Sequence, residues 1–327
     1  MAGQGLLAYS GVMKYVLGFD GGGTKTECVL MDAEKNVRAQ GRSGPSNPLR
    51  VGFGGSLAAV CEAGRLALQK ARVSSDQVVS LCAGLAGASQ AEAARKMKRL
   101  LGQEYPGTSV EVCTDLELTL EATGDGPAIV LVAGTGSAAV GRDTAGKIVR
   151  VGGHGPLLGD EGSAYDVGKR AAIAQLRYYD RHGHTSASGT KILKELGVES
   201  WQEFQSRVHA VPDEFFPKIF PVVARAADEG DPESQELLQL AAGELTLLVN
   251  DLVERLSLRE HKFLLVKTGG MVQRSRYFDE QLNQRLQQAA PHAEFGALAV
   301  TAAEAAARMA LRLLEREGDE RSDRGGA

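Results

Sequence analysis

Cysteine is scarce in this chain, and its four residues among 327 lie far apart. Cys28, Cys61, Cys82 and Cys113 sit in apolar runs without a CxxC spacing. This pattern excludes a disulfide framework and argues against a metal site built on cysteine. We therefore expect four reduced cysteines in a cytoplasmic protein.

Charge of a single sign and long apolar runs are also lacking. The 37 Lys and Arg residues nearly balance the 41 Asp and Glu residues, and no basic stripe of the kind that nucleic acid requires stands out. No segment reaches the roughly 18 continuous apolar residues of a spanning helix, and the first dozen residues lack the pattern of a signal peptide. We expect no nucleic-acid or membrane partner, and flexible ends at residues 1–13 and 316–327.

The length of the chain suits two domains of ordinary size. The runs VLGFD, TECVLMD and NVRAQG predict three short strands, and apolar spacing predicts a helix over residues 55–73. A strand VVSLCAGLAG, a helix over 90–103 and a strand SVEVCTD complete a β-β-β-α-β-α-β order. The turn residues at 123–127 then predict a boundary, so we expect one lobe over residues 14–122 and a second over 123–297.

The second lobe begins as the first one does. Gly23–Thr24 corresponds to Gly134–Thr135, Asp32 to Asp143, and Gly41 to Gly152, each at an offset of 111 residues. A constant offset indicates an internal repeat. We expect two similar α/β lobes, each with one glycine-rich hairpin.

The hairpins at Gly21–Gly23 and Gly134–Ser137 suit phosphate binding. Glycine lets backbone N–H groups approach an anion closely, and the neighbouring hydroxyls add donors. A simple tight turn would explain one such hairpin, but two at matching positions favour two loops that grip one nucleotide. Neither is a Walker A motif, since no GK[ST] follows, and neither is a Rossmann fingerprint, since each joins strand to strand.

Two acids follow strands of the first lobe. Asp20 directly precedes the glycines, where a carboxylate would hold Mg²⁺ through water beside nucleotide phosphates. Asp115 ends SVEVCTD, and the carboxyl ends of strands are where open α/β sheets place ligands. Asp115 is the candidate general base for phosphoryl transfer. The alternative is a helix N-cap for the segment LELTLEAT.

Short polar side chains that could bind sugar hydroxyls stand at Asn47, Asp160 and Glu161. Asn47 could instead form an Asx turn before a proline, and the two acids could interact with the dipole of a helix expected over 163–179. Gly269–Gly270 ends the strand FLLVKTGGMV, where missing side chains leave room for adenine. A tight turn is the alternative there.

Several blocks in one order carry a family resemblance: GFDGGGTKT, SN at 46–47, TD at 114–115, AGTGS, GGHGPLLGDEGSAYDVG at 152–168 and TGG at 268–270. On these blocks the chain resembles the actin-like ATPase superfamily, and within it the N-acetylglucosamine kinase and BadF/BadG/BcrA/BcrD ATPase family. The resemblance implies an α/β fold of two ribonuclease H-like lobes with a cleft between them. It also implies a C-terminal helix at about 298–315 that packs back on the first lobe.

The resemblance further implies an ATP-dependent sugar kinase, a phosphotransferase with an alcohol acceptor. N-acetyl-D-glucosamine at its 6-hydroxyl is the expected acceptor, and glucosamine kinase is the alternative. Expected cofactors are ATP and Mg²⁺, and the expected assembly is a homodimer. The implied ATP site comprises Gly22, Gly23, Thr24, Lys25, Gly134, Thr135, Gly136, Ser137, Gly269 and Gly270. The implied sugar site comprises Asn47, Asp115, Gly153, His154, Gly155, Asp160 and Glu161, with Asp115 as the base.

The chain departs from the family pattern at two places. His154 stands where relatives usually have Trp, and the segment Thr301–Ala305 lacks their Pro and Gly. Two rival functions within the superfamily fit less well. Iron–sulfur ATPases that activate a dehydratase or reductase need a cysteine pair, and sugar-sensing regulators carry an added DNA-binding domain, for which the segment before Lys14 is too short.

Overall fold

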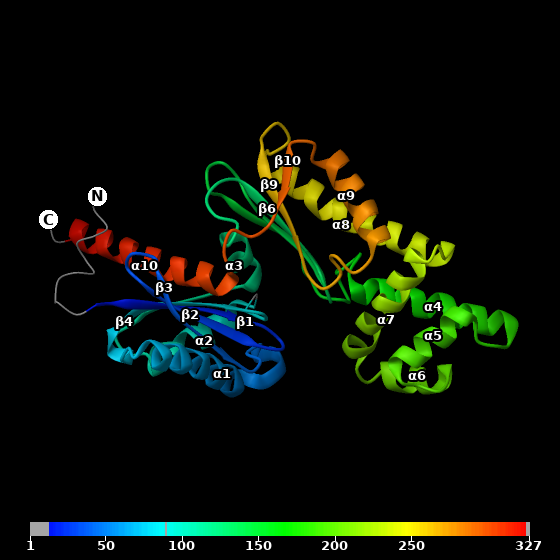
Figure 1. Ribbon diagram of the computed structural model, residues 1–327, viewed down its shortest axis with the longest axis horizontal. Coiled ribbons are helices and arrows are strands. Elements are labelled where there is room, and N and C mark those ends of the chain that lie inside the picture. Colours follow the sequence, from blue (N-terminus) through cyan, green and yellow to red (C-terminus); the bar gives the residue numbers. More distant parts are fainter. Residues whose placement is uncertain (1–12, 89, 325–327) are drawn as a thin grey trace. The chain divides into compact units, whose positions relative to one another are not determined.

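The chain forms two compact units in the computed structural model, which describes residues 13–88 and 90–324 (Figure 1). Unit 1 runs through Asp125 and resumes at Leu298, and unit 2 spans Gly126–Ala297. Each unit is built around its own five-stranded sheet. The outermost parts of the ends expected to be flexible, residues 1–12 and 325–327, lie outside the described residues.

Unit 1 has the β-β-β-α-β-α-β order that the sequence predicts, followed by a short helix and the C-terminal helix. Its elements are β1 (Tyr15–Gly21), β2 (Thr26–Asp32), β3 (Val37–Ser43), α1 (Pro48–Ala71), a 3-10 turn (Ser75–Gln77), β4 (Val78–Leu85), α2 (Ala91–Glu104), β5 (Ser109–Cys113), α3 (Asp115–Glu121) and α10 (Ala302–Arg324). The order across the sheet is β3-β2-β1-β4-β5. The first three strands are antiparallel, and β4 and β5 run parallel to β1.

Unit 2 has the same sheet topology, in the order β10-β9-β6-β7-β8. Its elements are β6 (Ala128–Ala133), β7 (Ser137–Arg142), β8 (Ile148–Gly152), α4 (Ala164–His182), α5 (Ala187–Leu196), α6 (Trp201–Val208), α7 (Pro212–Asp228), α8 (Pro232–Arg255), β9 (Phe263–Thr268), α9 (Arg276–Ala289) and β10 (Ala293–Gly296). Five helices, α4–α8, stand where unit 1 has α1, and the sequence had predicted only the first. The two matching sheets confirm the predicted α/β class.

One turn is repeated in both units. After β2, Asp32 Oδ1 accepts hydrogen bonds from the backbone of residues two and four positions ahead, at 3.0 and 2.9 Å. After β7, Asp143 Oδ1 accepts the same two bonds, at 2.8 and 2.9 Å. The residue three positions after each Asp, Lys35 or Gly146, has a positive φ. The internal repeat seen in the sequence therefore extends to side-chain hydrogen bonds.

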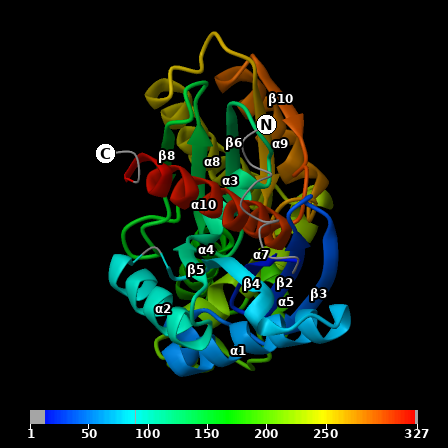
Figure 2. The same cartoon turned by 90° about the vertical axis from the view of Figure 1, so that its left-hand side faces the viewer.

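Helices cover both faces of the sheet in unit 1. Helices α1 and α2 pack on one face, and α10 lies across the other with α3 beside it (Figure 2). Gly18 of β1 lets α10 approach closely, since a Cβ there would stand 2.1 Å from the Ala307 nitrogen. Close packing is therefore achieved without the Pro and Gly of the family pattern.

Helix α10 differs from the prediction at both ends. It begins at Ala302 rather than near residue 298, because the Thr301 hydroxyl accepts a hydrogen bond from the Glu304 N–H at 3.2 Å. It continues to Arg324, past the expected start of a flexible end at residue 316. Glu and Arg are good helix formers, and they extend the helix beyond the apolar spacing on which the prediction was based.

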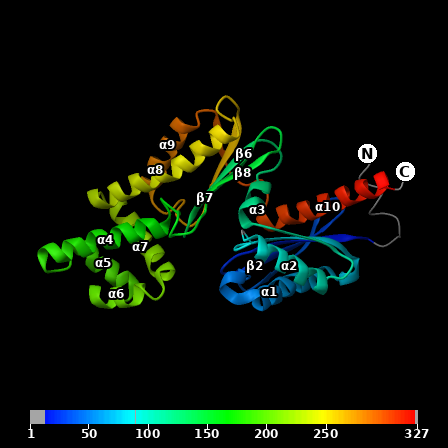
Figure 3. The same ribbon diagram turned by 180° about the vertical axis from the view of Figure 1, so that it is seen from behind.

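Helix α8 packs along the strands β6, β7 and β8 of unit 2, with α9 beside it. Helices α4 and α7 pack against each other and against α8, and α5 and α6 lie outside them (Figure 3). Trp201 and Phe204 of α6 are 2 % exposed and join the same apolar core as the strands. This helical layer enlarges the core of unit 2.

Helix α1 is the one helix within the described residues that is long and apolar enough to span a membrane by length and composition. This differs from the expectation that no segment would qualify. Gly52, with φ 72°, interrupts the helix after its first turn. Beyond it, Val60, Ala63 and Ala67 are fully buried in the core of unit 1, as in a core helix of a globular domain.

Candidate functional site

Three loops of unit 1 leave its sheet at one edge. Strands β1, β4 and β5 are parallel, and their register pairs Asp20 with Gly84 and Gly84 with Cys113. The Gly22–Lys25 hairpin, the loop that begins at Ala86 and the start of α3 therefore emerge side by side. Carboxyl ends of parallel strands are the usual ligand edge of an α/β sheet.

The Gly22–Lys25 hairpin is fixed to the segment that follows β3. The Gly22 carbonyl accepts hydrogen bonds from the N–H groups of Ser46 and Asn47, at 3.0 and 3.2 Å. A Cβ on Gly21 would stand 2.2 Å from Ser46 Oγ, so glycine is required for this approach. Lys25 Nζ donates to Glu27 Oε1 at 2.7 Å. The hairpin is thus held in one conformation by its neighbours.

Asp20 lies in a negative environment. Burial raises the pKa of its carboxyl from the ordinary value of 3.8 to about 6, the charges of Glu27 and Asp115 add to the rise, and Lys25 opposes it. A carboxylate under this penalty suits a divalent cation, which would relieve it. No cluster of three His, Cys, Asp or Glu side chains that could hold a metal occurs in the described part of the chain. Mg²⁺ would therefore depend on Asp20, water and substrate oxygens, which is its usual manner of binding.

Asp115 is the first residue of α3, at the same edge. The N-cap is Thr114, whose Oγ1 accepts from the Glu117 N–H at 3.1 Å while Glu117 Oε2 accepts from the Thr114 N–H at 2.8 Å. The alternative of an N-cap at Asp115 is therefore wrong. The Asp115 side chain is exposed, and it is close enough to Asp20 to raise the pKa of that carboxyl. This position leaves the Asp115 carboxylate accessible to a substrate hydroxyl.

Asn47 joins the site and also caps α1. Its Oδ1 accepts from the Leu49 N–H at 2.9 Å, which is the Asx geometry considered from the sequence. Its Nδ2 group can still donate to a sugar hydroxyl. Gly87 packs against this side chain, since a Cβ there would stand 2.7 Å from Asn47 Oδ1. Sequence reasoning gave Gly87 no role in the site, although it is the last residue of the predicted strand VVSLCAGLAG.

Two loops of unit 2 meet at the carboxyl ends of β6 and β9. These strands are parallel, and Val132 pairs with Thr268. Gly269 has φ 108°, and a Cβ there would stand 2.3 Å from the Ala133 carbonyl oxygen. The Met271 N–H donates to that oxygen at 3.0 Å. The Gly134–Gly136 loop therefore lies in direct contact with the Gly269–Gly270 turn.

The acids Asp160 and Glu161 lie against the Gly134–Gly136 loop. The Ser137 N–H donates to Asp160 Oδ1 at 3.3 Å, and the Ser137 hydroxyl donates to the Glu161 carbonyl at 2.7 Å. Burial raises the pKa of Asp160, and the Ser137 N–H opposes the rise. Neither acid caps α4, because Ser163 does so by accepting from the Asp166 N–H. Both donors of Ser137, a predicted ATP ligand, are thus engaged within the protein.

The start of α4 supports the same loop. The N–H groups of Ala164 and Tyr165 donate to the carbonyls of Gly134 and Thr135, at 2.9 and 3.2 Å. These carbonyls point towards the helix, and the first helical N–H groups are satisfied. The loop is therefore held between α4, the Gly269–Gly270 turn and Asp160.

The turn that bears His154 follows β8. Gly152, Gly153 and Gly155 all have positive φ, and the Gly153 N–H donates to the Ser137 carbonyl at 3.0 Å. Arg150 Nη2 donates to the Gly153 carbonyl at 2.6 Å. His154 is exposed, and its charge acts to lower the pKa of Asp160. The turn therefore places His154 near Asp160, on the side of unit 2 that carries the loops.

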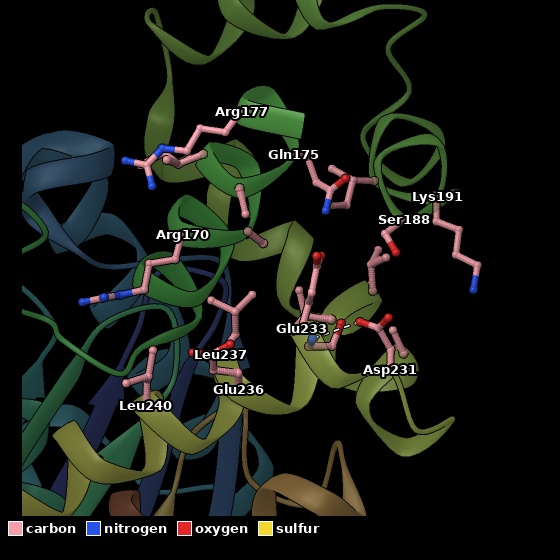
Figure 4. A pocket seen from close by; sticks show the side chains of 18 residues that line it. Arg170, Gln175, Arg177, Ser188, Lys191, Asp231, Glu233, Glu236, Leu237 and Leu240 are labelled. Carbon is pink, nitrogen blue, oxygen red and sulfur yellow. Dashed lines mark hydrogen bonds between the residues drawn. The ribbon is translucent and has the colours of Figure 1, made fainter. Parts of the chain in front are cut away.

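A separate cavity of about 560 Å³ opens among α4, α5, α7 and α8 (Figure 4). Apolar side chains such as Val222, Val223 and Leu237 line it together with basic and acidic ones, which include Arg170, Arg177, Lys191, Asp231, Glu233 and Glu236. None of the predicted site residues lines it. The sheet-edge loops therefore define the candidate site, and this cavity does not.

Known proteins resemble this chain over most of its length. Residues 17–306 match the model of the BadF/BadG/BcrA/BcrD ATPase family. The chain is 33 % identical over 275 residues to an N-acetylmuramic acid/N-acetylglucosamine kinase of Clostridium acetobutylicum, covering 82 % of this chain and 89 % of that protein. It is 29 % identical over 293 residues to an N-acetyl-D-glucosamine kinase of Dictyostelium discoideum, covering 85 % and 92 %. The crystal structure of a candidate N-acetylglucosamine kinase from Chromobacterium violaceum superposes with a TM-score of 0.75 at 26 % identity, over 91 % of this chain and 99 % of that one.

Proposed function

The chain belongs to the BadF/BadG/BcrA/BcrD ATPase family, and we propose that it is an ATP-dependent amino-sugar kinase. It transfers the terminal phosphoryl group of ATP to the 6-hydroxyl of N-acetyl-D-glucosamine. Two relatives that cover most of the chain are N-acetylglucosamine kinases by name, which supports a phosphotransferase with an alcohol acceptor.

The observation that carries the proposal is the edge of the unit 1 sheet. The Gly22–Lys25 hairpin, two acids and the side-chain amide of Asn47 lie there together. The two acids, Asp20 and Asp115, are close enough to interact electrostatically. Phosphoryl transfer needs an anion cradle, charge neutralisation and a base on the acceptor hydroxyl. The Gly22–Lys25 hairpin, Asp20 and Asp115 are suited to these three tasks.

In this account Asp115 accepts the proton of the sugar 6-hydroxyl as its oxygen bonds to phosphorus. The bond from that phosphorus to the bridging oxygen breaks, and ADP leaves with the electron pair. The N–H groups of Gly23, Thr24 and Lys25 bind phosphate oxygens whose charge is spread in the transition state. Gly22, also a predicted ATP ligand, shapes the hairpin, because its N–H donates to the Lys25 carbonyl at 2.9 Å. Mg²⁺, when bound near Asp20, neutralises phosphate charge. Asn47 orients the acceptor by donating from Nδ2.

Unit 2 supplies further contacts in this proposal. Thr135 and Gly136 bind phosphate, and the Gly269–Gly270 turn accommodates the adenosine. Gly134 and Ser137 shape this loop, because the Gly134 N–H donates to the Gly136 carbonyl at 3.0 Å and both donors of Ser137 are engaged by Asp160 and Glu161. Asp160, Glu161 and the turn Gly153–Gly155, with His154, bind sugar hydroxyls. Asp160 already contacts the Gly134–Gly136 loop through Ser137, so a sugar bound by Asp160 would lie beside phosphate.

A role as an iron–sulfur ATPase that activates a dehydratase or reductase is less well supported. Cys82 and Cys113 are in contact, with 3.9 Å between their sulfur atoms, but they are 0 % and 9 % exposed. Cys28 is also buried, and Cys61 is partly buried. These four thiols present no accessible pair to a cluster.

We further propose that the kinase is a cytoplasmic homodimer, as the family resemblance implies.

Steady-state kinetics with a panel of acceptors test the proposal. We expect the highest kcat/KM for N-acetylglucosamine, with glucosamine, glucose and N-acetylmuramic acid compared under the same ATP and Mg²⁺ concentrations. A pocket that hydrogen-bonds the acetamide strongly rejects sugars that lack it. A tenfold preference for glucosamine or glucose, about 1.4 kcal/mol in transition-state binding, would overturn the acetamide-reading pocket. Absence of phosphorylation of every sugar would overturn the kinase.

A further inference from the structure

Arg50 lies beside the glycine hairpin of unit 1, although it belongs to no motif identified from the sequence. A Cβ on Gly23 would stand 2.9 Å from Arg50 Nη1, 3.7 Å from its Cδ and 3.9 Å from its Cζ. The guanidinium group therefore runs along the space that a side chain at position 23 would fill. Glycine at this position makes room for the arginine.

The backbone holds Arg50 in this place. The N–H groups of Arg50 and Val51 both donate to the Asn47 carbonyl at 3.0 Å, and the Asn47 N–H donates to the Gly22 carbonyl. Gly52 breaks the helix immediately afterwards. The first turn of α1 is thus anchored to the hairpin, and the kink at Gly52 separates it from the longer second part of the helix.

The charge of Arg50 is not neutralised by a carboxylate in the described part of the chain, where no ion pair of this residue occurs. Lys25, the other cation of the hairpin, is paired with Glu27 at 2.7 Å. On the same helix, Arg65 is paired with Glu62 at 2.8 Å. The Arg50 side chain is exposed, and its guanidinium carries five N–H donors in a planar fork.

From this arrangement we propose that Arg50 binds the terminal phosphate of ATP at the Gly22–Lys25 hairpin. This inference rests on the proposed function and adds a residue to it. A planar guanidinium forms two parallel hydrogen bonds to a phosphate, and these charge-assisted bonds are about twice as strong as neutral ones. Backbone N–H groups of the hairpin and the Arg50 fork converge on one anion.

The alternative anion is a carboxylate on the acceptor, such as the acidic substituent of N-acetylmuramic acid. Arg50 is in the same segment as Asn47, a predicted sugar ligand. A guanidinium binds a carboxylate in the same way as it binds a phosphate. The position of Nη1 beside Gly23, within the predicted phosphate loop, favours the nucleotide. The experiment distinguishes the two.

The test measures binding of ATP, ADP and AMP, each with Mg²⁺, to the full-length protein by calorimetry, alongside steady-state kinetics. The variants are Arg50→Gln, Arg50→Lys and the matched control Arg65→Gln, an exposed arginine farther along α1. We expect Arg50→Gln to weaken ATP binding about tenfold and AMP binding hardly at all, since the charge-assisted pair of bonds to the terminal phosphate is lost. Arg50→Lys keeps the charge without the fork and should fall between. Arg65→Gln should behave as wild type.

Three results would overturn the inference. One is wild-type ATP affinity and turnover in Arg50→Gln. Another is an equal loss of affinity for ATP and AMP. The third is a higher KM for N-acetylmuramic acid alone, which would assign Arg50 to an acceptor carboxylate. Added methylguanidinium should restore turnover to Arg50→Ala. Such rescue is expected if the guanidinium contacts phosphate, and is not expected if Arg50 only stabilises the fold. If no sugar is phosphorylated by wild type, the proposed function fails, but the binding experiment still decides the role of Arg50.

Discussion

Thr26 and Ser137 hold equivalent places in the two units, each as the first residue of the strand that follows a glycine loop. Both side chains are buried, and both tie that strand to a segment carrying predicted sugar ligands. Thr26 Oγ1 donates to the Gly44 carbonyl at 2.7 Å and lies 2.7 Å from Ser46 Oγ. Ser137 Oγ donates to the Glu161 carbonyl at 2.7 Å. In each unit one hydroxyl therefore connects the glycine loop to the segment that carries the predicted sugar ligands.

Removal of these hydroxyls should loosen both segments. Thr26→Val keeps the shape but loses the bonds to residues 44 and 46. The Ser46 hydroxyl is fully buried, and a buried polar group left without its partner costs about 1–3 kcal/mol. We expect a lower free energy of unfolding by denaturant and raised KM values for ATP and sugar. Thr190→Val is the control, because the hydroxyl of Thr190 bonds to Ser186 in an exposed helix. Unchanged stability and KM in Thr26→Val would show that the hydroxyl does not couple the segments.

Replacement of Asp115 should affect turnover more than binding. We expect Asp115→Asn to lower kcat by roughly 10² to 10⁴, the usual contribution of a general base, with ATP affinity retained. Glu117→Gln is the matched control, since Glu117 belongs to the capping box of the same turn. It should leave both stability and kcat near normal, because a Gln side-chain oxygen at this position still completes the capping box. Near-normal kcat in Asp115→Asn would remove Asp115 from the chemistry.

The raised pKa of Asp20 predicts a pH dependence of stability. Its folded-state pKa of about 6 lies above the ordinary value of 3.8, so the folded protein holds a proton there that the unfolded chain has lost. The corresponding stability is present below about pH 4 and is lost as the pH rises through about 6. At pH 7 the ligand-free protein is therefore destabilised by about 2–3 kcal/mol.

Asp20→Asn should remove this penalty and raise the unfolding free energy at pH 7, while activity with ATP and Mg²⁺ falls. Chemical denaturation at pH 5 and pH 7 measures the difference. Asp76→Asn, at an exposed acid of the 3-10 turn, is the control. Equal stability of wild type and Asp20→Asn at both pH values would contradict the environment assigned to Asp20.

The two glycines of the Gly269–Gly270 turn differ in role: Gly269 is required by the fold, and Gly270 is predicted to leave room for adenine. Gly269→Ala introduces a Cβ at 2.3 Å from the Ala133 oxygen at a positive φ, whereas nothing lies within 4 Å of a Cβ on Gly270. We expect Gly269→Ala to lower the melting temperature. Gly270→Ala should leave melting unchanged and weaken ATP binding if adenine lies there. Normal ATP affinity in Gly270→Ala would place the adenine elsewhere.

Local patterns were sufficient to predict the strands of the first sheet and the repeat, but not β10 of the second sheet. Hairpins and turns such as those at Asp32 and Asp143 depend on residues close together in the sequence, and they can therefore be predicted from local patterns. Gly87 could not be assigned a role, because its contact with Asn47 depends on the register between β1 and β4. The bond from Ser137 to Asp160 spans 23 residues and depends on the turn between them. The helices α5–α8 pack on one another, and no strand or helix was predicted in this segment.

The central claim is phosphoryl transfer from ATP to the 6-hydroxyl of N-acetylglucosamine with Asp115 as base. Phosphorus NMR of a reaction with ATP, Mg²⁺ and N-acetylglucosamine tests it most directly, with Asp115→Asn run in parallel. The account predicts one sugar 6-phosphate formed for each ADP released, and a rate in Asp115→Asn reduced by at least about 10². ADP release without a phosphorylated sugar, or phosphate at another hydroxyl, would contradict it.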